Sequence, residues 1–295
     1  MNSRGGELEA QFSIGDEFGL FAEFYQPIDF ADRYYVFANA QISKLNNNLI
    51  AKDGSGEILS QARISGNGFQ LGVGRNFGQW GSLRIGLQKT YSKIRGRIGV
   101  PSDTVIKADA TTFTASFEVD TLDNVRFPHS GLVFGVDYNN SLALLGGDDR
   151  VDNVVASVYK PYTWGNNTLG LSLALGTSFN GTPDEIDLFP LGGFLNLTAF
   201  APGQLMGNHG GAAGLIYYRR VGGGLGYLTQ SPLYVGGLIE TGNLWNDTSD
   251  ISLGDLKWST SVFLGADTFI GPVYLGGGIG SKGEKAAFLY VGQLF

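Results

Sequence analysis

The stretch "LGLSLALG", residues 169–176, carries leucine at every second position, with glycine, serine or alanine at the positions between. Successive side chains of a β-strand point to opposite faces, so this alternation predicts a strand with one apolar face and one small or polar face. The same period recurs along the chain, for example in "TTFTASFEVD" (111–120) and "WSTSVFLGAD" (258–267). About fourteen segments follow it, most of them near ten residues long, and none shows a helical period. The sequence therefore predicts an all-β fold.

Two strand boundaries stay open at this level. Segments 57–65 and 67–77 are either two strands or one strand with a bulge, and 271–295 is expected to divide into a hairpin near 282–284. Glycine at these positions fits either bulges or turns, because it accepts backbone conformations that other residues avoid.

Two architectures can use long alternating strands. A soluble sandwich turns its apolar faces inward and has strands of about five or six residues. A membrane barrel turns them outward to lipid and needs about 9–11 residues per strand. The strands here are long, and long connections at 46–57, 97–109 and 180–207 alternate with short turns such as 270–272. That asymmetry is typical of external loops and periplasmic turns. We therefore expect an antiparallel transmembrane β-barrel of about fourteen strands, and a lectin-like sandwich is the remaining soluble alternative.

The composition excludes several classes of function. The chain has 295 residues, with Lys+Arg 20 against Asp+Glu 27 and a net charge of −7, and no basic run that would indicate a nucleic-acid partner. It has no cysteine, which excludes disulfides and cysteine-based metal sites. The two histidines, His129 and His209, are far apart in the sequence, and no G-x-S-x-G nucleophile turn is present. We expect no enzymatic activity, no metal and no cofactor.

Four motifs in the order of the chain carry a resemblance to a known family. They are "TLDNVRFPHSGL" (121–132), "LGGFLNLTAF" (191–200) followed by "GNHGGAAGLIYYRR" (207–220), "IETGNLW" (239–245), and "GPVYLGGG…FLYVGQLF" (271–295). Together they resemble the outer-membrane protein 85 (Omp85) superfamily, also called bacterial surface antigens, over essentially the whole chain. More narrowly, "FYQPID" and "LGGFLNL" are similar to the barrels of patatin-like autotransporters.

The resemblance implies one barrel domain over 1–295 in the bacterial outer membrane, with a long external loop folded into the lumen. It implies membrane lipid and the outer-membrane assembly machinery as partners. "GGELEAQFSIG" (5–15) is similar to the third of about sixteen family strands, which would leave an even fourteen and a barrel truncated at its N-terminal end.

The resemblance also implies a function, for which three possibilities stay open. The barrel translocates or anchors an N-terminal passenger, as in type V secretion, and a patatin-like hydrolase domain is one such passenger. Alternatively it is an assembly and insertion factor for outer-membrane proteins. The third possibility is a passive pore without a protein client.

The family's loop motif can be placed on this chain residue by residue. The matching positions are Gly192 and Gly193 for the paired glycines, Leu197 for a valine, Thr198 for the arginine and Phe200 for the aromatic. Glu240 matches the acidic residue that pairs with the family's arginine. Because threonine replaces arginine, that ion pair cannot form, and spacing suggests Arg219 or Arg220 as another partner for Glu240. The alternative is an ordinary long external loop with turn glycines.

The end of the chain carries a second motif. Leu289, Val291 and Phe295 fall on one face of the last expected strand, which ends in an aromatic residue. Outer-membrane barrel proteins commonly end in this way, and the assembly machinery reads that end, so the three residues are a candidate assembly signal.

Overall fold

The computed structural model describes residues 5–13, 17–50, 58–98, 105–142, 152–179, 189–223, 232–268 and 271–292. The chain divides into two compact units. Unit 1 comprises Met1–Glu118, Asp137–Val154 and Ser178–Ile186, and unit 2 comprises Val119–Val136, Val155–Thr177 and Asp187–Phe295.

Strands dominate the described residues. They are β1 (Glu7–Ser13), β2 (Glu17–Pro27), β3 (Tyr34–Ile50), β4 (Ile58–Asn76), β5 (Gly81–Ile98), β6 (Val105–Asp120), β7 (Val133–Ser141), β8 (Asp152–Trp164), β9 (Asn167–Ser178), β10 (Phe189–Leu191), β11 (Leu205–Gly207), β12 (His209–Gly223), β13 (Pro232–Trp245), β14 (Lys257–Thr268), β15 (Gly271–Gly280) and β16 (Lys285–Val291). The described helices are single 3₁₀ turns at Thr248–Asp250, Leu253–Asp255 and Ser281–Gly283. None of the described helices has the length and apolar character needed to cross a membrane.

Fourteen of these strands form one sheet in the order of the sequence, with β9 followed directly by β12. Neighbouring strands of this sheet pair antiparallel, as in β1–β2, β3–β4 and β12–β13. The short strands β10 and β11 pair with each other outside this sheet. The all-β antiparallel fold expected from the alternation is confirmed, and segments 57–65 and 67–77 join into the single strand β4.

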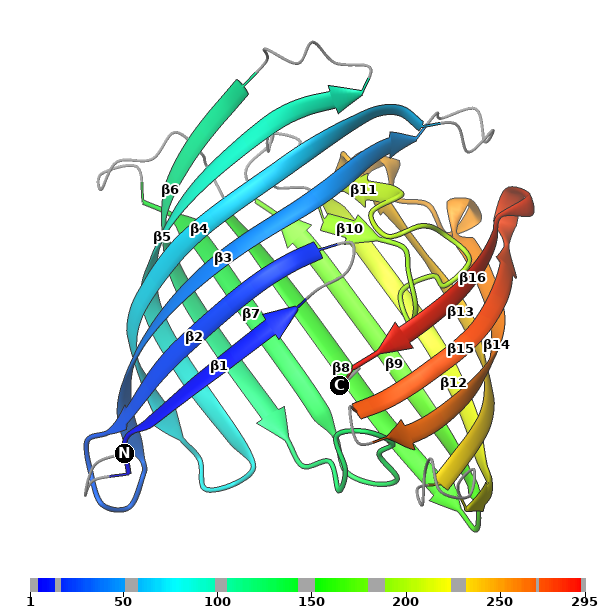
Figure 1. The fold of residues 1–295 in the computed structure, drawn as a ribbon, viewed down its shortest axis with the longest axis horizontal. Helices are drawn as coiled ribbons and strands as arrows, with labels where there is room; N and C mark the ends of the chain where they lie inside the picture. The colour runs from blue at the N-terminus through cyan, green and yellow to red at the C-terminus, as the bar shows by residue number, and fades with distance from the viewer. Residues whose placement is uncertain are drawn as a thin grey trace. The chain divides into compact units, whose positions relative to one another are not determined.

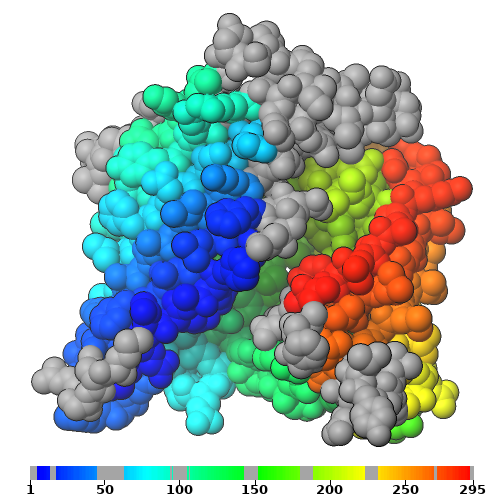
Figure 2. All heavy atoms as spheres, in the orientation of Figure 1, coloured from blue at the N-terminus to red at the C-terminus, as the bar shows by residue number. Residues whose placement is uncertain are grey.

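Unit 1 is built from long hairpins that lie side by side (β1 to β6, blue to green in Figure 1). One face, which we call the outer face, carries exposed apolar side chains such as Ile42, Phe69 and Leu71. The opposite, inner face carries polar residues that bond to one another. There the Arg84 guanidinium pairs with Glu23 at 2.5 Å, and the Gln70 amide donates to Thr114 at 2.7 Å. Figure 2 shows the atoms of β1 to β4 (blue to light blue) as one continuous surface of unit 1.

Unit 2 has the same two faces. Its outer face again carries exposed large apolar side chains, namely Leu169, Leu171, Leu173, Leu175, Leu215, Ile239, Val262, Leu264, Leu275 and Leu289. Leu171 is 53% exposed and Val262 is 69% exposed, although a water-soluble protein would bury most side chains of this kind. A row of this length along several paired strands is far larger than the apolar patches of soluble monomers, so its natural environment is hydrocarbon.

Aromatic rings on the inner face lie over glycines of neighbouring strands. A Cβ added to Gly236 would lie 2.6 Å from the carbonyl oxygen of Tyr217 and would overlap the Phe263 ring. Gly74 faces the Tyr35 ring in unit 1 in the same way. The high glycine content, 46 of 295, is thus partly explained by rings that need the space a side chain would fill.

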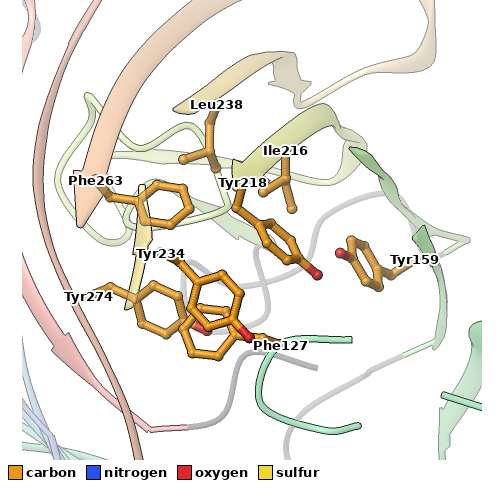
Figure 3. Close-up of a cluster of buried hydrophobic side chains, with 8 residues drawn as sticks. All are labelled: Phe127, Tyr159, Ile216, Tyr218, Tyr234, Leu238, Phe263 and Tyr274. Atoms are coloured by element: carbon orange, nitrogen blue, oxygen red, sulfur yellow. The ribbon is translucent and has the colours of Figure 1, made fainter. Parts of the chain in front are cut away.

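The core of unit 2 is a cluster of eight buried side chains on the inner face: Phe127, Tyr159, Ile216, Tyr218, Tyr234, Leu238, Phe263 and Tyr274 (Figure 3). Phe127 comes from the connection between β6 and β7, and its ring stacks on Tyr234 with centroids 3.9 Å apart. The carbonyl oxygens of Arg126 and Pro128 accept hydrogen bonds from the hydroxyls of Tyr274 and Tyr218. The motif noticed at 121–132 is therefore a turn that inserts one aromatic ring between strands.

Candidate functional site: the inner loop and Glu240

The connection between β9 and β12 folds back onto the inner face of unit 2. We call residues 189–207 the inner loop. Its two ends pair as β10 and β11, with Phe189 opposite Gly207 and Leu191 opposite Leu205. The segment between them packs over β12 to β16, as Figure 1 shows for the ribbon between β10 and β11.

Glycine is required where the loop turns back on itself. Gly192 has φ +126° and Gly193 has φ +95°, a region that residues with a side chain rarely adopt. The amide of Gly192 donates to the carbonyl of Asn196 at 2.8 Å, and that of Gly193 donates to the carbonyl of Phe200 at 2.8 Å. A side chain at Gly192 would also collide with the backbone of Ala201. The paired glycines therefore close the loop.

Glu240 of β13 holds the centre of the loop. The amide of Leu197 donates to Oε1 of Glu240 at 3.0 Å, and the amide of Thr198 donates to Oε2 at 2.8 Å. The next amide, that of Ala199, donates to Oγ of Ser259 on β14 at 2.9 Å. Three successive amides thus point at one carboxylate and one hydroxyl, and this is possible because Leu197 has a left-handed φ of +66°.

Because their donors and acceptors are buried, these hydrogen bonds fix the position of the loop. Leu197 is 0% exposed, Thr198 2% and Glu240 3%. An unpaired N–H or carboxylate in such a place costs about 1–3 kcal/mol or more, so the loop amides and Glu240 depend on each other. A small apolar cluster surrounds them, made of Leu191, Leu197, Ala199 and Phe200, with Leu205, Ala212 and Leu244 packed against it.

Phe194 joins the loop to the last strands of the chain. Its ring stacks on Phe288 of β16 with centroids 4.4 Å apart, and it lies 5.2 Å from Tyr274 of β15. At the rim, the Gln204 amide donates to Oε1 of Glu284 at 2.8 Å in the turn between these strands. The loop therefore contacts β13 to β16 through both polar and aromatic groups.

A cavity of about 290 Å³ adjoins the loop on its other side. Leu195 and Asn196 of the loop line it, together with Glu240 and residues of β8, β9 and β12 such as Tyr159 and Ser172. Its walls are mixed polar and apolar, and its volume suffices for several water molecules.

The structure brings together most of the loop residues singled out from the sequence. Gly192, Gly193, Leu197, Thr198 and Phe200 all lie in the folded inner loop, and Glu240 bonds to it through backbone amides.

The two arginines proposed as partners of Glu240 are elsewhere. Glu240 lies opposite Gly214, whereas Arg219 lies opposite Val235 and Arg220 opposite Tyr234. Five residues of strand separate Glu240 from the nearer of these pairs, a distance of roughly 17 Å at about 3.3 Å per residue. Arg219 also belongs to the outer face, because the side chains of a strand alternate. In place of a guanidinium, Glu240 takes two backbone N–H donors.

Sequence reasoning missed Ser259, Phe194 and the pair Gln204 and Glu284. Phe194 reads as part of a glycine-rich turn, and its ring partners on β15 and β16 lie about 80–95 positions further along the chain. The alternation along β14 places Ser259 on the inner face and Trp258 on the outer face, and this alternation is the sequence signal that could have identified Ser259. In the assembly motif, Leu289 and Val291 lie on the outer face of β16, and Phe295 lies outside the described residues.

Comparison with known proteins settles the family. A model of the Omp85 superfamily domain matches residues 2–272. The chain belongs to the Omp85 superfamily. The expected outer-membrane location and barrel fold follow from this membership. Omp85 barrels such as BamA and CdiB are transporters or assembly factors, not enzymes, which agrees with the expectation for this barrel domain. No curated protein sequence matches the chain.

Solved structures agree on the fold. BamA from Haemophilus ducreyi, lacking POTRA domains 1–3, is similar over 97% of this chain and 64% of its own, with a TM-score of 0.73 and 16% identity. CdiB from Escherichia coli is similar over 95% and 52%, with a TM-score of 0.62 and 12% identity. CdiB from Acinetobacter baumannii is similar over 90% and 47%, with a TM-score of 0.59 and 12% identity. The chain thus spans less than two thirds of each of these proteins.

Proposed function

We propose that this Omp85 barrel translocates an N-terminal passenger across the outer membrane or anchors it there, in the manner of type V secretion. The observation that carries the proposal is the inner loop, which Glu240 and Ser259 hold against the inner face through three successive amides. A segment held in the lumen in this way keeps the barrel closed until it is displaced, which suits a barrel that opens for a client.

The contacts of the loop suit a plug that can be released. Its centre is held by three directional hydrogen bonds to Glu240 and Ser259, beside the small apolar cluster around Leu197. The cavity of about 290 Å³ beside Leu195 and Asn196 leaves room for these loop residues to shift. Loss of the Glu240 bonds is therefore the step that would free the lumen.

The narrower resemblance to patatin-like autotransporters adds a proposal about the passenger. In that group the barrel follows a hydrolase domain, so a hydrolase is the passenger class we would examine first. The assembly machinery of the outer membrane is the second partner we propose, through the last strand and the candidate signal formed by Leu289, Val291 and Phe295.

Translocation can be tested with a reporter domain fused before residue 1 and expressed with an export signal in bacteria. We expect external protease to reach the reporter in intact cells. The Glu240→Ala variant should change the kinetics of its appearance, whereas Glu23→Ala, which removes an inner-face carboxylate of unit 1, should leave those kinetics unchanged.

Two other outcomes would replace the proposal. A reporter that stays in the periplasm, with faster insertion of unrelated barrels into vesicles containing the protein, would support an assembly factor. Large, steady conductance in planar bilayers that is insensitive to deletion of 190–206 would support a passive pore. A marked rise in conductance on that deletion supports the plug.

A further inference from the structure

Lysines gather on the outer face of unit 1 where its apolar surface ends. Along β3 the outer-face residues run Val36, Ala38, Ala40, Ile42 and then Lys44. Along β4 they run Val73, Leu71, Phe69 and then Asn67, and along β5 they run Ile85, Leu87 and then Lys89, Tyr91 and Lys93. Strand pairing places Ile42 opposite Asn67 and Asn67 opposite Tyr91. The outer face of these three neighbouring strands therefore changes from apolar to polar and cationic within a few residues, with Lys89 already opposite Phe69.

That level matches the edge of the hydrocarbon core. The apolar stretch of β3, from Val36 to Ile42, together with its flanking residues approaches the length of about 9–11 residues that a tilted strand needs to span it. Tyr91, 46% exposed, lies directly beyond, where the aromatic residues of barrels gather at the lipid headgroups. β3 and β5 continue beyond this level to Ile50 and Ile98.

The same level belongs to the external side of the membrane. Successive connections of an antiparallel barrel alternate between its two ends. The connections 51–57 and 99–104 follow Lys44 and Lys93 and lie at the same end of the strands as the longest connection, 179–208. The short connections 77–80 and 165–166 lie at the opposite end. Because long loops of outer-membrane barrels are external, the lysines face the external leaflet.

A groove of about 660 Å³ lies at this level between β3 and β6. Three lysines line it, Lys44, Lys93 and Lys107, together with Asn67, Tyr91 and Asp109. Lys89 lies beside it, with its Nζ 2.6 Å from Asp109. We call this set the lysine groove. Figure 1 shows β3 to β6 side by side over this region.

The charge of the groove is unusual for this chain. The chain as a whole carries −7, yet three lysines and the Lys89–Asp109 pair lie here, and Asp109 is the one carboxylate among the described lining residues. Among the residues that the structure describes, neither Lys93 nor Lys107 forms an ion pair. Lysine binds phosphate as a point charge, and lysines near a membrane surface attract anionic headgroups.

We propose that the lysine groove binds the phosphorylated headgroup of a lipid in the external leaflet. The acyl chains of this lipid lie along the apolar outer face below, over Phe69 and Leu71. Asn67 and Tyr91 offer hydrogen bonds to the sugar or phosphate oxygens. The occupant is thus a phosphate-bearing glycolipid rather than a soluble anion, since the groove opens directly onto the hydrocarbon-facing surface.

The test compares lipid binding of two triple variants that lose the same charge. The first is Lys44→Gln, Lys93→Gln, Lys107→Gln. The control is Lys160→Gln, Lys282→Gln, Lys285→Gln, three exposed lysines outside the groove. The folded barrel in detergent is titrated with a diphosphorylated glycolipid of defined acyl chains and followed by native mass spectrometry. Unchanged heat-modifiable migration on gels shows that each variant is folded.

Each lysine near a membrane surface is worth roughly a fivefold change in affinity, so the groove variant should bind on the order of 100-fold more weakly than the wild type. The control should bind like the wild type. The dephosphorylated glycolipid should bind weakly to all three proteins, and wild-type affinity for the phosphorylated lipid should fall as salt rises.

Equal binding of the phosphorylated lipid by the groove variant and the wild type would overturn the proposal. Equal binding of the dephosphorylated lipid by the wild type would do the same, because it would assign the contact to the acyl chains alone. If inorganic phosphate at millimolar concentration displaces the glycolipid completely, the groove is a site for soluble anions and the lipid assignment is wrong. Should the triple variant fail to fold, the exposed Lys107→Gln change alone and the salt dependence carry the same test.

Discussion

Replacement of Glu240 by alanine should release the inner loop without unfolding the sheet. The change removes both acceptors of the Leu197 and Thr198 amides, which donate at 3.0 and 2.8 Å. Hydrogen bonds to a charged group contribute about 1.5–3 kcal/mol each, so losing two of them costs the closed loop about 3–6 kcal/mol. Water from the adjoining cavity recovers part of this loss, which leaves at least about 2 kcal/mol. That corresponds to a rise of about 30-fold or more in the opening equilibrium.

Amide hydrogen exchange, read by mass spectrometry on the peptide around 194–201, measures this opening directly. Exchange at Leu197 and Thr198 should accelerate by at least the same factor in Glu240→Ala. The amides of β12 and β13 should keep their protection, because their ladder bonds do not involve the carboxylate. Glu240→Gln keeps one oxygen acceptor and turns an NH₂ group toward the other amide, so it should give an intermediate effect of about 1–3 kcal/mol.

The matched control is Glu23→Ala, which removes an inner-face carboxylate of unit 1 that pairs with Arg84. Loop exchange in this variant should equal that of the wild type. If loop exchange in Glu240→Ala stays within about twofold of the wild type, Glu240 does not hold the loop, and the plug has to be explained by its apolar and aromatic contacts alone.

Three further outcomes follow from local geometry. Phe127→Ala should destabilise the folded barrel by about 3–5 kcal/mol in urea titrations, because it removes the ring that stacks on Tyr234. The control Phe30→Ala, at a side chain that is 97% exposed, should change the free energy of unfolding by less than about 0.5 kcal/mol. Gly236→Ala should lower the free energy of unfolding by about 1–3 kcal/mol, because the new methyl group forces the Phe263 ring aside. A Cβ added at Gly222 would have no atom within 4 Å, so Gly222→Ala should leave stability unchanged, and equal effects of the two variants would refute the glycine–ring packing. A backbone amide and an arginine side chain hold the pKa of Asp29 at about 2, below its usual 3.8. The stability it contributes is therefore present above about pH 4 and lost as pH falls through about 2, and a carboxyl NMR titration with a midpoint near 4 would contradict this.

The sheet could be predicted from the sequence because its signal is local. Leucine at every second position around Leu171 fixes a strand and its two faces, and the same rule places Ile239 and Val262 on the outer face. The joining of 57–65 with 67–77 could not be decided, because Gly66 and Gly68 fit a bulge and a turn equally well. The division of 271–295 into β15 and β16 was expected and is confirmed.

Sequence reasoning predicted part of the loop site. The family resemblance pointed to Glu240 and the inner loop, but the donors are backbone amides, which every residue but proline has and which leave no trace in a sequence. Arg220 was a reasonable candidate, since it shares the inner face with Glu240. Only the register shows that it lies near the opposite end of the strand. The lysine groove was missed for a related reason: its lysines belong to three strands and meet only through pairing.

The orientation of the sheet faces is tested most directly by single cysteines along β9. The chain has no cysteine, so each variant carries one spin label. In lipid vesicles, labels at positions 171 and 173 should collide with dissolved oxygen, and labels at 172 and 174 should collide with a water-soluble nickel complex, since these two positions border the inner cavity. The two accessibilities should alternate out of phase with a period of two residues. Reversed phase, or no alternation, would contradict the assignment of the apolar face to lipid and the inner loop to the lumen.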